Sequence, residues 1–140
     1  MRLVLDINVL VAALRSKEGA SARVLEAVYE GRIVALANVA LFAEYEAVLT
    51  RAEHLAVGGV SHESVIESLD ALAYRIEPAE PHFSWRPQLP DPDDEMVLEA
   101  AVNGGAEAIV TFEVGTFREA AARFGIDVLT PAQIWAKVMP

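Results

Sequence analysis

Short apolar runs alternate with amphipathic helical segments along almost the whole chain, and few folds accommodate such an alternation. The runs expected to form strands are residues 2–5, 33–36, 75–77, 108–111 and 128–129. Between them, apolar side chains recur at helical spacing and are bounded by capping residues and glycines. Strands that alternate with helices form a parallel sheet with helices on both faces. We therefore expect an α/β fold in one domain that spans residues 1–140.

The expected helices begin at side chains that cap helix N-termini. Their expected extents are 21–30, 38–50, 61–74 and 91–104, with a last helix that opens at 130–133. Two of these starts carry strong signals. Asp91 before Pro92 combines a side-chain cap with proline at the first helical position, and Thr130 with Gln133 forms a capping box.

Composition excludes several classes of protein. Of the 140 residues 54% are hydrophobic, which is enough for a sizeable core, and no cysteine is present for a disulfide, a thiolate zinc site or a cysteine nucleophile. The apolar, cysteine-free composition favours the cytoplasm, and no apolar run approaches the roughly 20 residues of a membrane span. The net charge of −10 argues against a broad basic surface, so any contact with nucleic acid is expected to be local or metal-mediated.

Two polar residues follow the first apolar run. Asp6 ends the run where open α/β sheets bind their ligands, beyond the carboxyl end of a strand. It is therefore a candidate functional residue, although a helix cap would also explain it. Asn8 either orients Asp6 or a metal-bound water, or is itself the cap.

Other acids are distributed between helix faces and helix starts. Helical projection puts Glu44 at the edge of an apolar stripe, where the residues alone favour a solvated side chain over a ligand. In the acidic run at 91–95, Asp94 shares the face of the apolar Val97, whereas Glu95 and Glu99 are expected to project away from it. For Asp94, a site residue and a helix-start acid are equally good interpretations.

Glu113 follows the fourth expected strand, so it belongs to the same strand-end layer as Asp6. Several carboxylates that converge there would repel one another unless a divalent cation neutralised them. A set of oxygen ligands favours Mg²⁺ or Mn²⁺ over zinc.

The order of these features resembles the PIN-domain family, and within it the VapC-like toxin branch. The resemblance rests on Leu5-Asp6-Ile7-Asn8, Phe42-Ala43-Glu44-Tyr45, Asp91-Pro92-Asp93-Asp94, Ile109-Val110-Thr111 and Leu129-Thr130-Pro131, and it covers nearly the whole chain. It implies a three-layer α/β/α domain with strand order 3-2-1-4-5. It also implies a carboxylate pocket that binds Mg²⁺ or Mn²⁺ and hydrolyses phosphodiester bonds in RNA.

Matched residue by residue, Asp6, Glu44 and Asp94 fall on the acidic metal-site positions of the family, with Asn8 beside them. The resemblance therefore reverses the first interpretation of Glu44. It further implies a small antitoxin as a partner. Together with the apolar helix stripes it implies a homodimer, since a small α/β domain cannot cover all of them.

The chain departs from the family pattern at three positions. Ile7 stands where the family usually has a hydroxyl side chain, and Glu113 and Thr116 stand where it usually has asparagine or aspartate and then aspartate. Glu113 is a candidate replacement for the missing fourth acid. Two functions follow as expectations: a metal-dependent ribonuclease that is the toxin of a toxin-antitoxin pair, or a weakened domain that binds RNA or protein.

Overall fold

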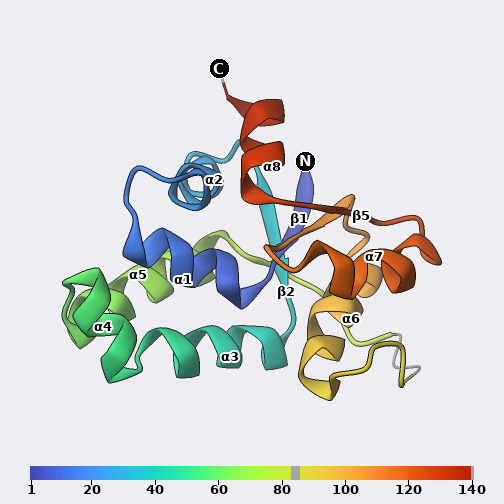
Figure 1. Ribbon diagram of the computed structural model, residues 1–140, viewed down its shortest axis with the longest axis horizontal. Helices are drawn as coiled ribbons and strands as arrows, with labels where there is room; N and C mark the ends of the chain where they lie inside the picture. The colour runs from blue at the N-terminus through green and yellow to red at the C-terminus, as the bar shows by residue number, and fades with distance from the viewer. Residues whose placement is uncertain (83–85, 140) are drawn as a thin grey trace.

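The computed structural model describes residues 1–82 and 86–139 of the chain. Within these residues, five strands form one parallel sheet in the order β3-β2-β1-β4-β5. They are β1 (Arg2–Leu5), β2 (Val34–Ala37), β3 (Glu77–Pro78), β4 (Ala108–Val110) and β5 (Asp127–Leu129). Figure 1 shows β1 beside its neighbour β2. The expected α/β class and strand order are therefore confirmed.

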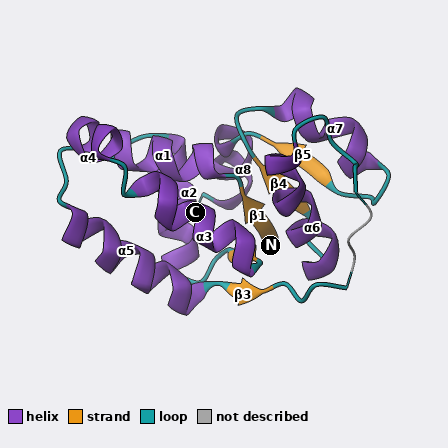
Figure 2. Cartoon of the chain, turned by 90° about the horizontal axis from the view of Figure 1, so that it is seen from below, coloured by secondary structure: helices purple, strands orange, loops and turns teal. Residues whose placement is uncertain are grey.

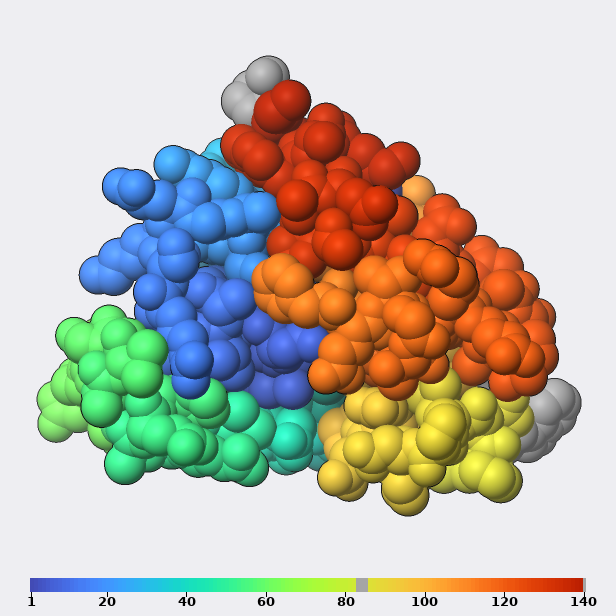
Figure 3. Space-filling model, viewed as in Figure 1, coloured from blue at the N-terminus to red at the C-terminus, as the bar shows by residue number. Residues whose placement is uncertain are grey.

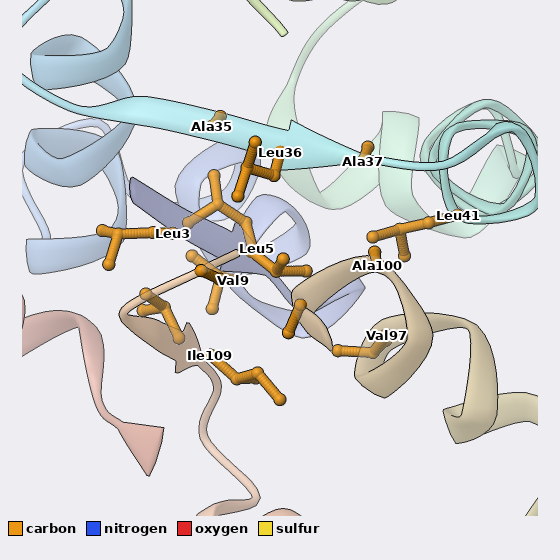
Figure 4. Packing of buried hydrophobic residues seen from close by; sticks show 14 of the residues in the cluster. Leu3, Leu5, Val9, Ala35, Leu36, Ala37, Leu41, Val97, Ala100 and Ile109 are labelled. Carbon is orange, nitrogen blue, oxygen red and sulfur yellow. The ribbon is translucent and has the colours of Figure 1, made fainter. Parts of the chain in front are cut away.

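The central strand β1 is buried on both faces, which explains its unbroken apolar sequence. Val4 pairs with Leu36 of β2 on one side and with Ile109 of β4 on the other. Figure 4 shows Leu3 and Leu5 packed among side chains of β2 and of the helices. The core thus holds β1 and its neighbours in fixed register, and with them the residues that follow each strand.

Eight α-helices and one short 3₁₀ helix lie in the described part of the chain. They are α1 (Ile7–Arg15), α2 (Ala20–Tyr29), α3 (Val39–Leu49), α4 (Ala52–Gly58), α5 (His62–Arg75), η1 (Pro92–Asp94), α6 (Glu95–Gly104), α7 (Val114–Ala122) and α8 (Pro131–Val138). Figure 2 shows α1, α3 and α5 on one side of the strands and α6 and α7 on the other. This arrangement follows from right-handed crossovers between parallel strands.

Several expected helix starts are confirmed by the capping bonds. The Asn38 side chain accepts a hydrogen bond from the backbone N–H of Leu41 at 2.8 Å. The Thr130 and Gln133 side chains each accept from the backbone N–H of the other, as a capping box requires. At the other end of a helix, Gly105 ends α6 with φ +65°, a conformation that glycine adopts without strain.

Other boundaries differ from those expected. Helix α2 begins before Ser21, which is buried in its first turn, because the backbone of Gly19 already accepts the first helical bond. Strand β3 starts at Glu77, because α5 continues through Arg75. Helices α4 and α7 have no counterpart among the expected elements. The expected helix at 91–104 starts with the 3₁₀ turn η1.

The strand ladder continues past the ends of β1 and β4. The backbone N–H of Asp6 donates to the carbonyl of Val110 at 2.9 Å, and that of Thr111 to the carbonyl of Leu129 at 3.0 Å. Asp6 and Thr111 are therefore fixed side by side at the carboxyl edge of the sheet. Of the helices in the described part of the chain, none is both long enough and apolar enough to cross a membrane.

Candidate active site

Asp6 is held by two hydrogen bonds at the end of β1. Its side chain is 5% exposed. One carboxylate oxygen, Oδ1, accepts from the backbone N–H of Ile7 at 2.8 Å, and the other, Oδ2, accepts from the Thr111 hydroxyl at 2.8 Å. Asp6 is thus both the N-cap of α1 and a strand-end carboxylate, so its two interpretations from the sequence are compatible.

Thr111, which the motif Ile109-Val110-Thr111 contains but which was not predicted as a site residue, is the centre of this network. It is fully buried, and while its hydroxyl donates to Asp6 it accepts from the Asn8 amide at 3.3 Å and from the backbone N–H of Glu113 at 3.0 Å. The sequence signal that could have indicated Thr111 is its place as a hydroxyl residue directly after β4, the strand that pairs with β1. Thr111 fixes the orientation of the Asp6 carboxylate.

Asn8 is linked to Asp6 by hydrogen bonds that pass through this threonine. Its amide nitrogen donates to the Thr111 hydroxyl, and its oxygen Oδ1 accepts from the backbone N–H of Phe112 at 3.4 Å. Of the roles expected for Asn8, the structure supports orientation of Asp6 and assigns the helix cap to Asp6 itself.

Asp94 lies at the junction of η1 and α6, and its side chain makes no capping hydrogen bond. The pKa of Asp94 is raised to about 6, first by burial and next by the negative charge of Asp6. The charges of Asp91, Glu113 and Asp93 contribute smaller parts of the same shift. Asp94 is therefore close enough to Asp6 and Glu113 for their charges to destabilise its ionised form.

The same coupling reaches Asp6. Burial raises the pKa of Asp6, the hydrogen bonds from Thr111 and Ile7 oppose that effect, and the charge of Glu113 adds to it. Glu113 itself is exposed at the N-cap position of α7, where its side chain makes no capping bond. Asp6, Asp94 and Glu113 therefore form one electrostatically coupled group, which we call the acid triad.

Glu44 lies outside the acid triad. It is partly buried on α3, and it is not among the charges that act on Asp6 or Asp94. Its neighbour Tyr45 is buried, and the Tyr45 hydroxyl donates to the carbonyl of Leu5, which ties α3 to the end of β1. Burial raises the pKa of Tyr45, and the charge of Asp6 raises it further. The role of Glu44 stays a prediction.

An open cavity of about 590 Å³ adjoins the acid triad. Its walls come from the loop before η1 and from α7, which lie side by side in Figure 3. They include Gln88, Asp91, Asp94, Glu113, Thr116 and Arg123. Two of the three acids thus face a space large enough for a small ligand.

Glu95 differs from its sequence prediction, because it is buried and does not project into solvent. Its side chain is 1% exposed, and its oxygen Oε1 accepts from the backbone N–H groups of Gln88 at 2.6 Å and Leu89 at 3.0 Å. Helical projection failed because the preceding loop folds back over the first turn of α6. Glu99 is also drawn toward this loop, by an ion pair with Arg86. Glu95 therefore holds one wall of the cavity in place.

The donor atoms of the acid triad are all carboxylate oxygens, which suit a hard divalent cation. Among residues 1–82 and 86–139, no three histidine or acidic side chains lie close enough together to enclose an ion by themselves. Magnesium in proteins is commonly held by only one or two carboxylates and is completed by water and substrate phosphates. The arrangement thus fits a cation that shares its coordination with a substrate.

Comparison with solved structures shows the same fold. The chain is similar to one in the crystal structure of VapBC2 from Rickettsia felis bound to a DNA fragment from its promoter. The TM-score is 0.59 and the identity 14%, over 93% of this chain and 98% of that one. It is also similar to a chain of FitAB bound to an IR36 DNA fragment, with TM-score 0.59 and 17% identity, over 92% and 94% of the two chains.

None of the curated proteins compared with the chain matches it in sequence. A family model described as PIN domain matches residues 2–115, which run from the start of β1 into the first turn of α7 and contain every acid of the site. The match agrees with the resemblance found in the sequence motifs. The chain therefore belongs to the PIN-domain family.

Proposed function

We propose that this protein is a ribonuclease that uses Mg²⁺ or Mn²⁺ and acts as the toxin of a toxin-antitoxin pair. PIN domains are generally nucleases that depend on divalent metal ions. The observation that carries the proposal is the acid triad, in which carboxylates from three separate segments act on one another beside an open cavity. Such repulsion is relieved when a cation binds.

Each acid has a distinct part in this proposal. Asp6 offers a carboxylate whose direction is set by Thr111 and the backbone of Ile7. Asp94 has no capping bond to break before it turns toward a ligand, and Glu113 approaches from the opposite wall of the cavity. A divalent cation bound there would supply Lewis-acid stabilisation of the scissile phosphate and a more acidic water.

Glu44 is proposed as a further acid of the site, acting on a cation through water. Its support is its match to the family motif and the Tyr45 hydrogen bond that ties α3 to the end of β1. Its absence from the acid triad favours this indirect role over direct ligation.

The test is cleavage of single-stranded RNA with Mn²⁺ or Mg²⁺ by the wild type and by Asp6→Ala. We expect cleavage that stops in a chelator and falls by at least about 100-fold in Asp6→Ala, as is typical when a transition-state electrostatic group is lost. Asp70→Ala, an exposed acid on α5, is the matched control and should cleave like the wild type. Equal activity in Asp6→Ala and the wild type would refute the mechanism.

The second candidate function is a binding module that cleaves poorly. Thr116 favours it, because this cavity wall carries a neutral side chain where the family pattern has an acid. Calorimetry separates the two functions. Divalent-metal binding that disappears in Asp94→Asn supports the nuclease, whereas RNA binding without any metal binding supports the module.

We propose two partners in addition to RNA. A small antitoxin is supported by the fold shared with VapBC2 and FitAB, and a basic side chain of such a protein would complement the acid triad. Expression of the chain alone should arrest growth, and expression of Asp6→Ala should not.

A homodimer is supported by exposed apolar side chains such as Val39 and Tyr74, and a monomer in light scattering would contradict it.

A further inference from the structure

The cavity beside the acid triad contains a single basic side chain among the described residues that line it. Four carboxylates line its walls, from Asp91, Asp94, Glu113 and Glu119, and Arg123 is the only cationic group among the described lining residues. Since the whole chain carries a net charge of −10, its long-range field repels a polyanion. Attraction of a phosphate into this cavity therefore depends on a local cation.

Arg123 is held in a defined position at the rim of the cavity. It follows the last residue of α7, and its nitrogen Nη2 donates to the carbonyl of Gln88 at 3.4 Å and to the side-chain oxygen of Gln88 at 3.2 Å. Gln88 belongs to the loop before η1, and its backbone N–H donates a hydrogen bond to the buried Glu95 carboxylate. The guanidinium is thus fixed across the cavity before any ligand arrives.

This arrangement leaves most of the guanidinium available. Arginine carries five N–H donors, and both hydrogen bonds from Arg123 to Gln88 use Nη2. The guanidinium fork matches the geometry of a phosphate, and charge-assisted bonds of this kind are stronger than neutral ones. The neutral Thr116 and Gly115 lie in the same cavity, so its walls are not lined by acids alone.

We propose that Arg123 binds a phosphate of a single-stranded nucleic acid next to the phosphate held at the acid triad, so that the cavity accommodates the nucleotide between them. The open cavity of about 590 Å³ is large enough for one nucleotide-sized ligand. This inference rests on the proposed nuclease function, which it deepens by naming the substrate contact. Arg123 acts in binding and does not touch the reacting atoms.

The test measures binding and cleavage separately. Binding of a labelled single-stranded RNA is followed by fluorescence anisotropy with Ca²⁺, and cleavage is followed with Mn²⁺. Arg123→Ala should weaken binding about tenfold and raise KM to the same extent, as expected for one charge-assisted contact, while kcat stays within about twofold. The slope of log affinity against log salt concentration should fall by about 0.7 for one lost phosphate contact on a single strand.

Arg118→Ala is the matched control. Arg118 lies on α7, the helix that Arg123 directly follows, and it is exposed, but it lines a separate hollow together with residues of β5. We expect it to leave the salt slope and KM unchanged. Equal losses in the two variants would show an effect of net charge alone and would overturn the proposal, as would an unchanged Arg123→Ala. Circular dichroism of each variant checks that the fold is intact.

Two further outcomes separate this inference from the function on which it rests. If the wild type binds RNA and Arg123→Ala weakens that binding, but nothing is cleaved, the phosphate contact stands and the nuclease proposal fails. If the wild type cleaves RNA and Arg123→Ala behaves identically, the contact fails and the nuclease stands. Tight binding of duplex RNA, equal to that of the single strand, would overturn the assignment to a single-stranded substrate.

Discussion

The two sides of the candidate site are built differently. On the sheet side, Asp6 accepts two hydrogen bonds, is almost fully buried and is fixed by Thr111. On the helix side, Asp94 has no capping bond, and burial together with the charges of its neighbours raises its pKa to about 6. Burial raises the pKa of both carboxylates, but hydrogen bonds from Thr111 and Ile7 orient Asp6 and oppose that shift, whereas Asp94 has no such bond at its helix start.

This difference assigns separate physical roles to the two sides. The buried network around Thr111 stabilises the fold and fixes the orientation of the Asp6 carboxylate. The helix side holds like charges together at an energetic disadvantage, as active sites often do. Substitutions on the sheet side should therefore lower both stability and activity, whereas those on the helix side should lower activity and metal affinity without loss of stability.

The largest expected effect of a substitution outside the acids is that of Thr111→Val. Valine has a similar shape but no hydroxyl, so Asp6, Asn8 and the N–H of Glu113 lose a shared partner. Unsatisfied groups of this kind typically cost about 1–3 kcal/mol. Denaturant unfolding should show that loss, and cleavage should fall by about 10–100-fold, as for other residues that orient a ligand.

The control for this change is Thr116→Val, which removes an exposed hydroxyl from the cavity wall. It should change the free energy of unfolding by less than about 0.5 kcal/mol. A similar loss of stability in both variants would mean that the Thr111 network is no more important than a surface hydroxyl.

Glu113 and Thr116 test whether the fourth acid has been replaced. If Glu113 supplies that charge, Glu113→Gln should weaken Mn²⁺ affinity about tenfold, which corresponds to about 1.4 kcal/mol. Thr116→Asp should then strengthen binding only slightly, because it adds repulsion as well as a ligand. Calorimetric titration of both variants checks this, and unchanged affinity in both would show that neither position contributes.

Glu44→Gln should have a smaller effect on Mn²⁺ affinity than Glu113→Gln. The reason is that Glu44 is not among the charges that act on Asp6 or Asp94, and we propose that it acts on the cation through water. The measurement is the same titration, with Glu46→Gln on the exposed part of α3 as its control. A loss as large as that in Asp94→Asn would make Glu44 a direct ligand and would contradict the indirect role.

The smallest expected effect is a gain in stability. The pKa of Asp94 is about 6 in the folded protein, compared with 3.8 for an aspartate in the unfolded chain. Between these two pH values the folded state therefore binds more protons than the unfolded state. The free energy of unfolding therefore falls as pH rises through this window. Without metal, Asp94→Asn should be more stable than the wild type above pH 6, by about 1 kcal/mol because Asp94 is partly solvated.

Thermal unfolding at several pH values checks whether Asp94→Asn is more stable than the wild type. The difference between Asp94→Asn and the wild type should be present at neutral pH and disappear as the pH falls below 3.8, where the wild-type carboxyl becomes protonated in the unfolded state as well as in the folded state. A less stable Asp94→Asn at neutral pH would show that Asp94 contributes to the fold, and the contrast between the two sides would be lost.

The sheet and most helix starts could be predicted because their causes are local. The apolar run at 2–5 needs burial on both faces, and the Asn38 and Thr130 caps are bonds within one turn. Asp6 was found for the same reason, since its place after a buried strand is visible in the sequence. Local rules did not predict α7, because its N-terminus has no side-chain capping bond.

The site could be predicted only in part because its remaining contacts join distant segments. Thr111 and Asp6 are 105 residues apart and meet only because β1 and β4 are neighbours. Glu95 was placed on the wrong face because the loop that buries it comes from outside the helix. Arg123 has no motif at all, and only the closure of the cavity between α7 and this loop gives it a candidate function.

The most direct test of the central claim is calorimetric titration of Mn²⁺ into three proteins: the wild type, Asp94→Asn and the surface control Asp70→Asn. The account predicts saturable binding by the wild type and by Asp70→Asn, and loss of that binding in Asp94→Asn, because Asp94 belongs to the repelling group that a cation relieves. The same binding in all three proteins would contradict it, since the cation would then lie away from the acid triad.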